Sequence, residues 1–143
     1  MQIIPNRSTN AADGLLEGET TGQIIGAFYA IYNELGHGFL ESVYAGALEV
    51  ELTERGIPYV REHPLDVLYH GHVIGMFRAD FFVVGRVIVE VKSARSLSEV
   101  DHRQLFNYLR STNTEVGLLL HFGPKARFYR TVRTAEGGSA RIR

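Results

Sequence analysis

The chain of 143 residues contains no cysteine and only four prolines. Without cysteine there can be no disulfide bond, no thiolate-bound zinc and no cysteine nucleophile. The sequence also lacks an apolar stretch near the roughly 20 residues that a membrane-spanning helix needs, and it does not start with a charged region followed by a long apolar run. We therefore expect a protein with no membrane segment and no secretion signal, located in the cytoplasm.

A large net charge is also missing, because 15 lysines and arginines balance 16 aspartates and glutamates, giving −1. This balance argues against attraction of nucleic acid to the whole surface. The C-terminal part is nevertheless locally basic, since it contains Lys125, Arg127, Arg130, Arg133, Arg141 and Arg143 against the single acid Glu136. Such a basic patch could hold a phosphate backbone, or it could be an edge strand whose charges prevent aggregation of sheets.

With 45% hydrophobic residues, the chain is large enough to bury a core as one globular domain. Its polar start predicts a flexible N-terminal arm over residues 1–17. The final GGSARIR predicts a flexible basic C-terminal tail, which we place over residues 134–143. The folded domain is then expected over residues 18–133.

The most informative segment is VIVEVK, residues 87–92, which places two opposite charges inside a β-branched apolar run. Because side chains alternate along a strand, Glu90 and Lys92 lie on the same face. The neighbouring valines and isoleucine predict a largely buried strand. Burying an isolated charge costs several kcal/mol, so we expect chemistry or a bound metal beside these two side chains.

A second strand is expected over residues 76–84, and Gly85 predicts the turn of a hairpin. With the turn centred there, the numbers of paired residues sum to about 170, which sets Asp80 opposite Glu90 or within one residue of it. Carboxylates roughly 5 Å apart repel each other unless one is protonated or a divalent cation lies between them. Mg²⁺ prefers such oxygens, and Lys92 could reach the same point. The competing interpretation is a surface ion-pair ladder in which Lys92 neutralises both acids.

Periodicity places helices and strands around this hairpin. A helix is expected over residues 20–35, and another opens near Gly38 and ends at Gly56. Its apolar residues recur at helical spacing: Leu40, Val43, Tyr44, Ala47, Leu48 and Leu52. A third helix is expected over residues 98–111, where Gln104 and Tyr108 share one face because they stand at i and i+4.

Further extended segments are expected over residues 58–69, over residues 116–121 and, after a turn at Gly123, up to about residue 132. A hairpin followed by a helical crossover to another strand gives a mixed sheet by the crossover rule. The pattern therefore predicts an α/β sandwich.

The chain thus presents an acid on a helix, an acid on a strand, Glu-x-Lys on the next strand and Gln-x-x-x-Tyr on a later helix. This order resembles the PD-(D/E)xK nucleases, and the string GFLESVY is similar to the signature of the small GxxExxY proteins assigned to them. The resemblance runs from Gly22 to Val132 and includes YHGHVIGMFRADFFV and QLFNYLRSTNTEVGLLLHFG. One departure is Ala79, which stands where the PD motif has proline.

The resemblance implies a restriction-endonuclease-like core, which is a three-layer sandwich with a central mixed β-sheet flanked by helices. It also implies a metal-dependent phosphodiesterase that acts on DNA or RNA with Mg²⁺ or Mn²⁺. Asp80, Glu90 and the backbone carbonyl of Val91 would then bind the metal. Glu41 would be a further ligand, through water, or would support a second ion.

The resemblance gives the remaining site residues supporting roles. Lys92 would position or help to deprotonate the attacking water and would contact the phosphate. Gln104 and Tyr108 would fix Lys92 and the substrate backbone by hydrogen bonds. Two other interpretations stay open at this point: a binding or accessory module that keeps the fold but depends on a protein partner for activity, and a phosphohydrolase that acts on a small nucleotide.

Overall fold

The computed structural model describes residues 16–133 and the backbone of residues 140–142. The helices are α1 (Gly18–Leu35), α2 (Glu41–Glu54) and α3 (Glu99–Thr112). The strands are β1 (Tyr59–Tyr69), β2 (His72–Val83), β3 (Val87–Lys92), β4 (Val116–Phe122), β5 (Ala126–Arg133) and β6 (Ala140–Ile142). Of the predicted N-terminal arm, all but its last two residues lies outside the described part.

The strands form one mixed sheet in the order β1-β2-β3-β4-β5-β6. Only the β3–β4 pair is parallel, because α3 carries the chain over between these strands, and the other neighbours are antiparallel. In the β2–β3 hairpin, Phe81 pairs with Val89 and Val83 with Val87. The register that the turn at Gly85 predicts is therefore confirmed.

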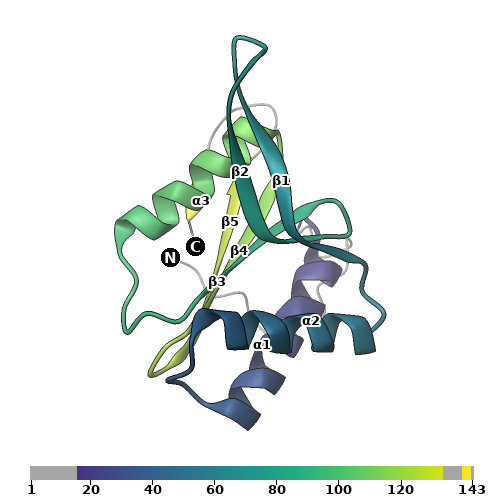
Figure 1. Ribbon diagram of the computed structural model, residues 1–143, viewed down its shortest axis with the longest axis vertical. Helices are drawn as coiled ribbons and strands as arrows, with labels where there is room; N and C mark the ends of the chain where they lie inside the picture. Colours follow the sequence, from purple (N-terminus) through teal and green to yellow (C-terminus); the bar gives the residue numbers. More distant parts are fainter. Residues whose placement is uncertain (1–15, 134–139, 143) are drawn as a thin grey trace.

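Helices cover both faces of the sheet (Figure 1). On one face, α1 and α2 pack on the odd-numbered residues of β3 and the even-numbered residues of β4. On the other face, Leu105 and Leu109 of α3 pack on Ile88 and Leu119. The predicted three-layer sandwich with a central mixed β-sheet flanked by helices is confirmed. Because side chains alternate along β3, each of them points either to the side of α1 and α2 or to the side of α3.

Local sequence explains where α3 begins and ends. The Ser98 hydroxyl accepts a hydrogen bond from the N–H of Val100, and the Asp101 carboxylate accepts one from the N–H of Ser98. This reciprocal capping box satisfies backbone donors that a helix start leaves free. At the other end Asn113 adopts a left-handed conformation with φ of 56°, which asparagine tolerates better than most residues. The helix therefore begins within one residue of its predicted position.

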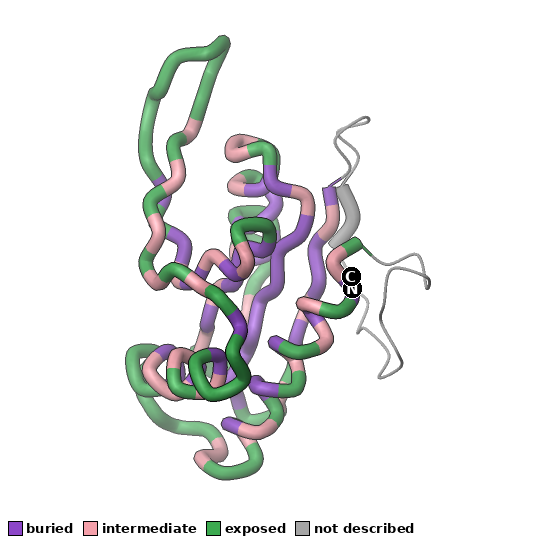
Figure 2. Tube along the Cα trace, turned by 90° about the vertical axis from the view of Figure 1, so that its right-hand side faces the viewer, coloured by how far each residue is buried: buried purple, intermediate pink, exposed green. Residues whose placement is uncertain are grey.

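The β1–β2 hairpin is much longer than the rest of the sheet requires. Only Phe81, Phe82 and Val83 of β2 pair with β3, whereas β2 pairs with β1 from end to end apart from Ile74 and Asp80. The distal part of the hairpin consequently projects beyond the helices (Figure 1), and its distal residues are exposed (Figure 2). A register shift between Val67 and Leu68 marks the start of this projecting part.

The segment after residue 133 differs in part from the predicted flexible tail. Residues 140–142 form β6, which pairs antiparallel with β5. The free edge of β5 offers unpaired backbone groups, and a strand that follows closely in the chain can satisfy them. Residues 134–139 and residue 143 lie outside the described part. Along the described residues, no helix combines the length and the apolar character needed to cross a membrane.

Candidate active site

The acidic and basic side chains of β3 lie on the face that α3 covers. Val87, Val89 and Val91 pack on the side of α1 and α2, and Ile88 packs on the side of α3. Because side chains alternate along a strand, those of Glu90 and Lys92 point to the same side of the sheet as that of Ile88. Both side chains are partly buried at the C-terminal half of a strand that is parallel to β4. In open α/β sheets this end of parallel strands is where ligands bind.

Asp80 and Glu90 lie together where β2 leaves β3. One Glu90 carboxylate oxygen accepts a hydrogen bond from the Asp80 N–H at 3.1 Å, and one Asp80 oxygen accepts a hydrogen bond from the Val91 N–H at 2.8 Å. These two side-chain bonds take the place of the backbone ladder, which ends at the pair Phe81 and Val89. The two strands therefore diverge at the acids, and each carboxylate is fixed against the opposite strand.

Burial raises the pKa of both carboxyl groups. Burial raises the pKa of Glu90 to about 8, and the Asp80 charge adds to this rise. Burial also raises the pKa of Asp80, although the hydrogen bond from the Val91 N–H opposes the change. With a pKa of about 8, the Glu90 carboxyl group is largely protonated at neutral pH, and a cation that binds it would have to displace this proton.

Lys92 lies close enough to the acids to favour their ionised forms, since its charge lowers the pKa of both Asp80 and Glu90. Its amine makes its nearest ion pair with Asp101 of α3, with 3.8 Å between Nζ and Oδ1. Both side chains are about a quarter exposed, at 25% and 27%. Asp101 thus links the start of α3 to the lysine of the Glu-x-Lys segment.

Glu41 is the first residue of α2 and is exposed. Its charge raises the pKa of both Asp80 and Glu90, so its carboxylate lies within electrostatic range of the pair. Tyr44, one turn later, fixes this end of the helix. Its hydroxyl donates to the Gly36 carbonyl at 2.6 Å and accepts from the Phe39 N–H at 3.3 Å. The GxxExxY spacing therefore places Glu41, whose charge acts on the two acids, one turn before Tyr44, whose buried side chain fixes the start of the helix.

Gln104 and Tyr108 differ in how closely they approach the acids. The Glu90 charge acts on Tyr108, and burial together with this charge raises the pKa of the Tyr108 hydroxyl. The Tyr108 ring stacks on Phe77, with 3.4 Å between ring centres. Gln104 is exposed and makes no side-chain hydrogen bond in the part of the chain that is described. It lies between Asp101 and Tyr108 on one helical face, because i, i+3 and i+7 are neighbours.

The donor atoms fit a hard divalent cation. Asp80 and Glu90 supply the carboxylate oxygens. Burial disfavours the ionised form of each side chain, and a bound cation would favour that form instead. Within residues 16–133, no cluster of three or more His, Cys, Asp or Glu side chains is arranged to hold a metal ion. Mg²⁺ typically binds through one or two carboxylates and completes its shell with water and substrate phosphates. Two carboxylates therefore suit an ion such as Mg²⁺ or Mn²⁺, which takes its other ligands from water and phosphate. They do not suit an ion that needs all its ligands from the protein.

The predicted basic patch is wrong for two of its members. Arg130 and Arg133 are each only 6% exposed. The Arg130 guanidinium donates to the Leu16 carbonyl, and the Arg133 guanidinium donates to the Asn113 side chain at 3.0 Å. These arginines bind the protein's own chain instead of presenting charge to solvent. The side chains of Arg141 and Arg143 lie outside the described part.

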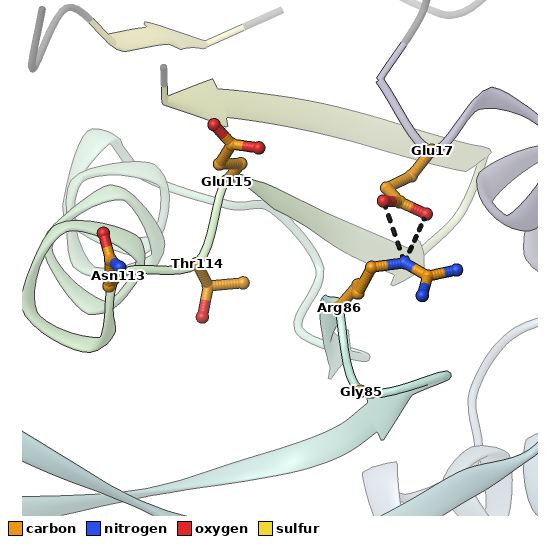
Figure 3. A pocket seen from close by; sticks show the side chains of 6 residues that line it. All are labelled: Glu17, Gly85, Arg86, Asn113, Thr114 and Glu115. Carbon is orange, nitrogen blue, oxygen red and sulfur yellow. Dashed lines mark hydrogen bonds and ion pairs between the residues drawn. The ribbon is translucent and has the colours of Figure 1, made fainter. Parts of the chain in front are cut away.

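A depression of about 370 Å³ lies at the opposite end of the parallel strands (Figure 3). It is lined by Glu17, Gly85, Arg86, Asn113, Thr114 and Glu115. An ion pair of 3.0 Å between Arg86 and Glu17 lies across one side. Because β3 and β4 begin here, the depression is at the N-terminal ends of the parallel strands, away from Asp80 and Glu90.

Sequence reasoning missed two residues near the acids. Asp101 holds the amine of Lys92, and a Ser-x-x-Asp capping pattern one turn before Gln104 was the available signal. Glu62 raises the pKa of Asp80 from the neighbouring strand. It interrupts the β1–β2 pairing opposite Asp80, with a left-handed φ of 51°. Counting back from the turn at Gly71 would have placed Glu62 opposite Ala79, because the register shift between Val67 and Leu68 moves the pairing by one residue.

Comparisons with known proteins agree with this architecture. The family model described as the PD-(D/E)XK nuclease superfamily matches residues 18–133. The crystal structure of SSO0001 is similar over 80% of this chain, with 25% sequence identity and a TM-score of 0.50. This chain covers 58% of that protein's chain. No protein of curated function matches the sequence.

Proposed function

Because the chain belongs to the PD-(D/E)XK nuclease superfamily, we propose that it hydrolyses phosphodiester bonds of DNA or RNA with Mg²⁺ or Mn²⁺. The observation that carries the proposal is the pair of carboxyl groups of Asp80 and Glu90. They are held on diverging strands with raised pKa values and with Lys92 beside them. Burial of two acids lowers the stability of the fold if they have only a structural role. A cation site, in contrast, needs ligands that are fixed in position and shielded from water.

Asp80, Glu90 and the Val91 carbonyl are the proposed ligands, and Glu41 would be a further ligand through water or would support a second ion. A bound Mg²⁺ or Mn²⁺ would lower the pKa of a coordinated water and screen charge on the phosphate. The two backbone hydrogen bonds that fix the carboxylates remove their rotational freedom before any ion arrives. Preorganisation of this kind lowers the free energy needed to assemble the site.

Lys92 supplies a positive charge for the phosphate beside the two acids. Its amine can donate a hydrogen bond to a phosphate oxygen or to the attacking water, and Asp101 restricts the positions it samples. The raised pKa of Tyr108 keeps its hydroxyl protonated, so it can donate to the substrate backbone. Gln104, exposed on the same helical face, is the proposed second donor.

The direct test is a cleavage assay with Mg²⁺ or Mn²⁺ on single-stranded DNA, duplex DNA and RNA. Wild type should cleave at least one polymer, and chelation of the metal should stop cleavage. Glu90→Gln should abolish turnover because it keeps the shape of the side chain and removes a charged ligand. Glu54→Gln, an exposed acid at the end of α2, is the matched control and should leave cleavage unchanged.

A nucleic-acid-binding or accessory module that depends on a protein partner is the second candidate. The observation that favours it is the absence of a third acidic ligand in contact with Asp80 and Glu90 among the described residues. In that case purified protein would retain DNA or RNA without cleaving it. If wild type does not cleave any polymer and Glu90→Gln still retains DNA or RNA, the protein is a binding module.

A further inference from the structure

Most basic side chains of the described part already have a partner within the protein. Ion pairs with acids engage Arg55, Arg61, Arg86 and Lys92. Hydrogen bonds or contacts with an aromatic ring engage Arg78, Arg103, Arg110, Arg130 and Arg133. The exposed side chains of Arg95, Lys125 and Arg127 make no such contact with the described residues, and we call these three the basic cluster. Their charges are therefore available to an anion from solution.

The basic cluster lies at one end of the sheet. Arg95 belongs to the connection from β3 to α3, and Lys125 belongs to the turn between β4 and β5 (Figure 1). His121 joins these two connections, because its Nε2 donates a hydrogen bond to the Ala94 carbonyl at 2.6 Å and its ring packs on Gly123. A Cβ atom at Gly123 would lie only 2.6 Å from the same Nε2. The two connections are therefore held beside each other at the C-terminal ends of β3 and β4.

Arg127 lies in a row with Lys92 across the sheet. The Cα partner of Lys92 is His121, and the partner of His121 is Arg127. Partners on neighbouring strands point to the same side, which is the side of α3, because Leu119 and Tyr129 pack there two residues away. Neighbouring strands lie about 4.8 Å apart, so the Arg127 and Lys92 backbones are ~10 Å apart. The basic cluster thus continues from Lys92 on the face that carries the acids.

A row of cations that leads away from the proposed metal site requires an anion with several charges in a row. A nucleic-acid strand carries one phosphate for about every 3.4 Å along a duplex axis, so ~10 Å corresponds to about three nucleotides. An acidic segment of a protein has no such regular row of charges, and it offers no phosphate to a metal ion held by Asp80 and Glu90. The charge and the place of the basic cluster therefore favour a nucleic-acid strand.

We propose that the basic cluster binds the phosphates that flank the scissile phosphate of a DNA or RNA strand. The proposal rests on the nucleic-acid substrate of the proposed function and does not require hydrolysis. With one phosphate beside Lys92, the strand continues past His121 to Arg127. Arg95 and Lys125 contact it from the two connections on either side of His121. Phosphate contacts fix the position of a strand without reading its bases, so the basic cluster sets register and not sequence preference.

The salt dependence of binding measures the number of phosphate contacts. Binding of single-stranded DNA, duplex DNA and RNA is titrated with Mg²⁺ between about 50 and 200 mM salt, in the Glu90→Gln background to prevent cleavage. The cluster triple carries Arg95→Gln, Lys125→Gln and Arg127→Gln. Its slope of log affinity against log salt should be shallower by about 2 on a single strand and about 3 on a duplex, since each lost contact removes about 0.7 or 0.9.

The control triple has the same change of net charge at three other places: the end of α2, the opposite end of the parallel strands and the last turn of α3. It carries Arg55→Gln, Arg86→Gln and Arg110→Gln. Its slope should equal that of the Glu90→Gln parent. A cluster triple with the slope of the control triple would overturn the proposal, as would a parent that binds none of the three polymers at the lowest salt.

Two further measurements separate the proposal from its alternatives. Polyglutamate of matching charge is the probe for an acidic protein partner. If it binds as tightly as the oligonucleotides and loses as much affinity in the cluster triple, the proposal fails. Cleavage by wild type is measured separately. A shallower slope without any cleavage would support the basic cluster and remove the proposed hydrolysis, whereas cleavage with an unchanged slope would support hydrolysis and overturn the role of the basic cluster.

Discussion

At the residue scale, the central feature is a glutamic acid that its surroundings keep protonated. Burial and the neighbouring Asp80 raise the pKa of Glu90 from 4.5 to about 8. A folded state that holds a proton which the unfolded state has released becomes less stable as the pH rises. The same proton competes with a metal ion for the carboxylate, so metal affinity should increase with pH over the same range.

Glu90→Gln should remove this pH dependence from the metal-free protein. Between 4.5 and about 8 the folded wild type binds more protons than the unfolded chain, so its free energy of unfolding should fall as pH rises. The fall from this group is at most about 1.4 kcal/mol per pH unit. Urea denaturation with chelator across this window measures the slope. Equal slopes for wild type and Glu90→Gln would contradict the assignment, and Glu54→Gln should match wild type.

Lys92→Ala separates electrostatic catalysis from metal binding. Lys92 is not a proposed ligand, so metal binding should persist. Cleavage should fall by about 10² or more, the scale of losing a positioned charge at a transition state. Calorimetric metal titration and single-turnover cleavage check the two parts. Arg86→Ala removes an exposed arginine at the opposite end of the strands and should change neither quantity. Unreduced cleavage in Lys92→Ala would exclude the proposed role.

At the scale of elements, the connection from α1 to α2 depends on one buried side chain. Tyr44 is fully buried, and its ring stacks on Phe122 of β4 with 4.2 Å between ring centres. Its hydroxyl holds both sides of the turn, at Gly36 and at Phe39. Gly36 has a positive φ of 67°, a conformation that glycine adopts without strain. The helix that carries Glu41 is therefore fixed to the sheet and to the preceding helix at its first turn.

Tyr44→Phe should lower the free energy of unfolding by about 1 kcal/mol, because the Gly36 carbonyl and the Phe39 N–H each lose a partner. It should also weaken the effect of Glu41 at the site, since the start of α2 becomes less fixed. Chemical denaturation measures the first effect. Tyr29→Phe is a matched control, because Tyr29 is 37% exposed and its hydroxyl makes no hydrogen bond in the described part. A Tyr44→Phe protein as stable as Tyr29→Phe would disprove the anchor.

At the scale of the whole molecule, the sheet separates a dry core from a polar site. α1 and α2 enclose the larger hydrophobic cluster on one face, whereas α3 shares the other face with the acids and Lys92. The divergence of β2 from β3 makes this possible, because it opens the ladder at Asp80 without breaking the core side. The β2–β3 hairpin therefore contributes both to the hydrophobic core and to the proposed metal site, so metal binding should affect the stability of the fold.

Mg²⁺ or Mn²⁺ should raise the melting temperature, since a ligand that binds only the folded state stabilises it, by about 2.7 kcal/mol at 100 times its dissociation constant. Asp80→Asn should increase metal-free stability, by removing one of two repelling acids, and should abolish the metal-induced shift. Thermal unfolding with chelator or with metal measures both effects. Glu34→Gln, an exposed acid of α1, is the control. A metal-induced shift that survives in Asp80→Asn would place the ion elsewhere.

Much of this protein could be derived from local patterns. Alternation along VIVEVK puts Glu90 and Lys92 on one face, and the turn at Gly85 fixes the hairpin register that sets Asp80 opposite Glu90. These relations hold because strand and turn geometry depend on neighbours in the chain. Helical spacing gave α2 and α3 for the same reason.

Only the tertiary structure decided which charges are buried and which partners they find. Alternation places Arg127 and Arg133 on one face of the last strand, yet Arg127 is exposed, whereas Arg133 is buried against the Asn113 side chain and Arg130, on the other face, against the Leu16 carbonyl. Lys92 pairs with Asp101 because α3 returns over β3 after the crossover. Burial, the pKa of a carboxyl group and the choice of an ion-pair partner depend on residues distant in the chain. The sequence by itself therefore determined the order of the elements and the side chains that could meet, and the packing of α3 on the diverging hairpin decided their environment.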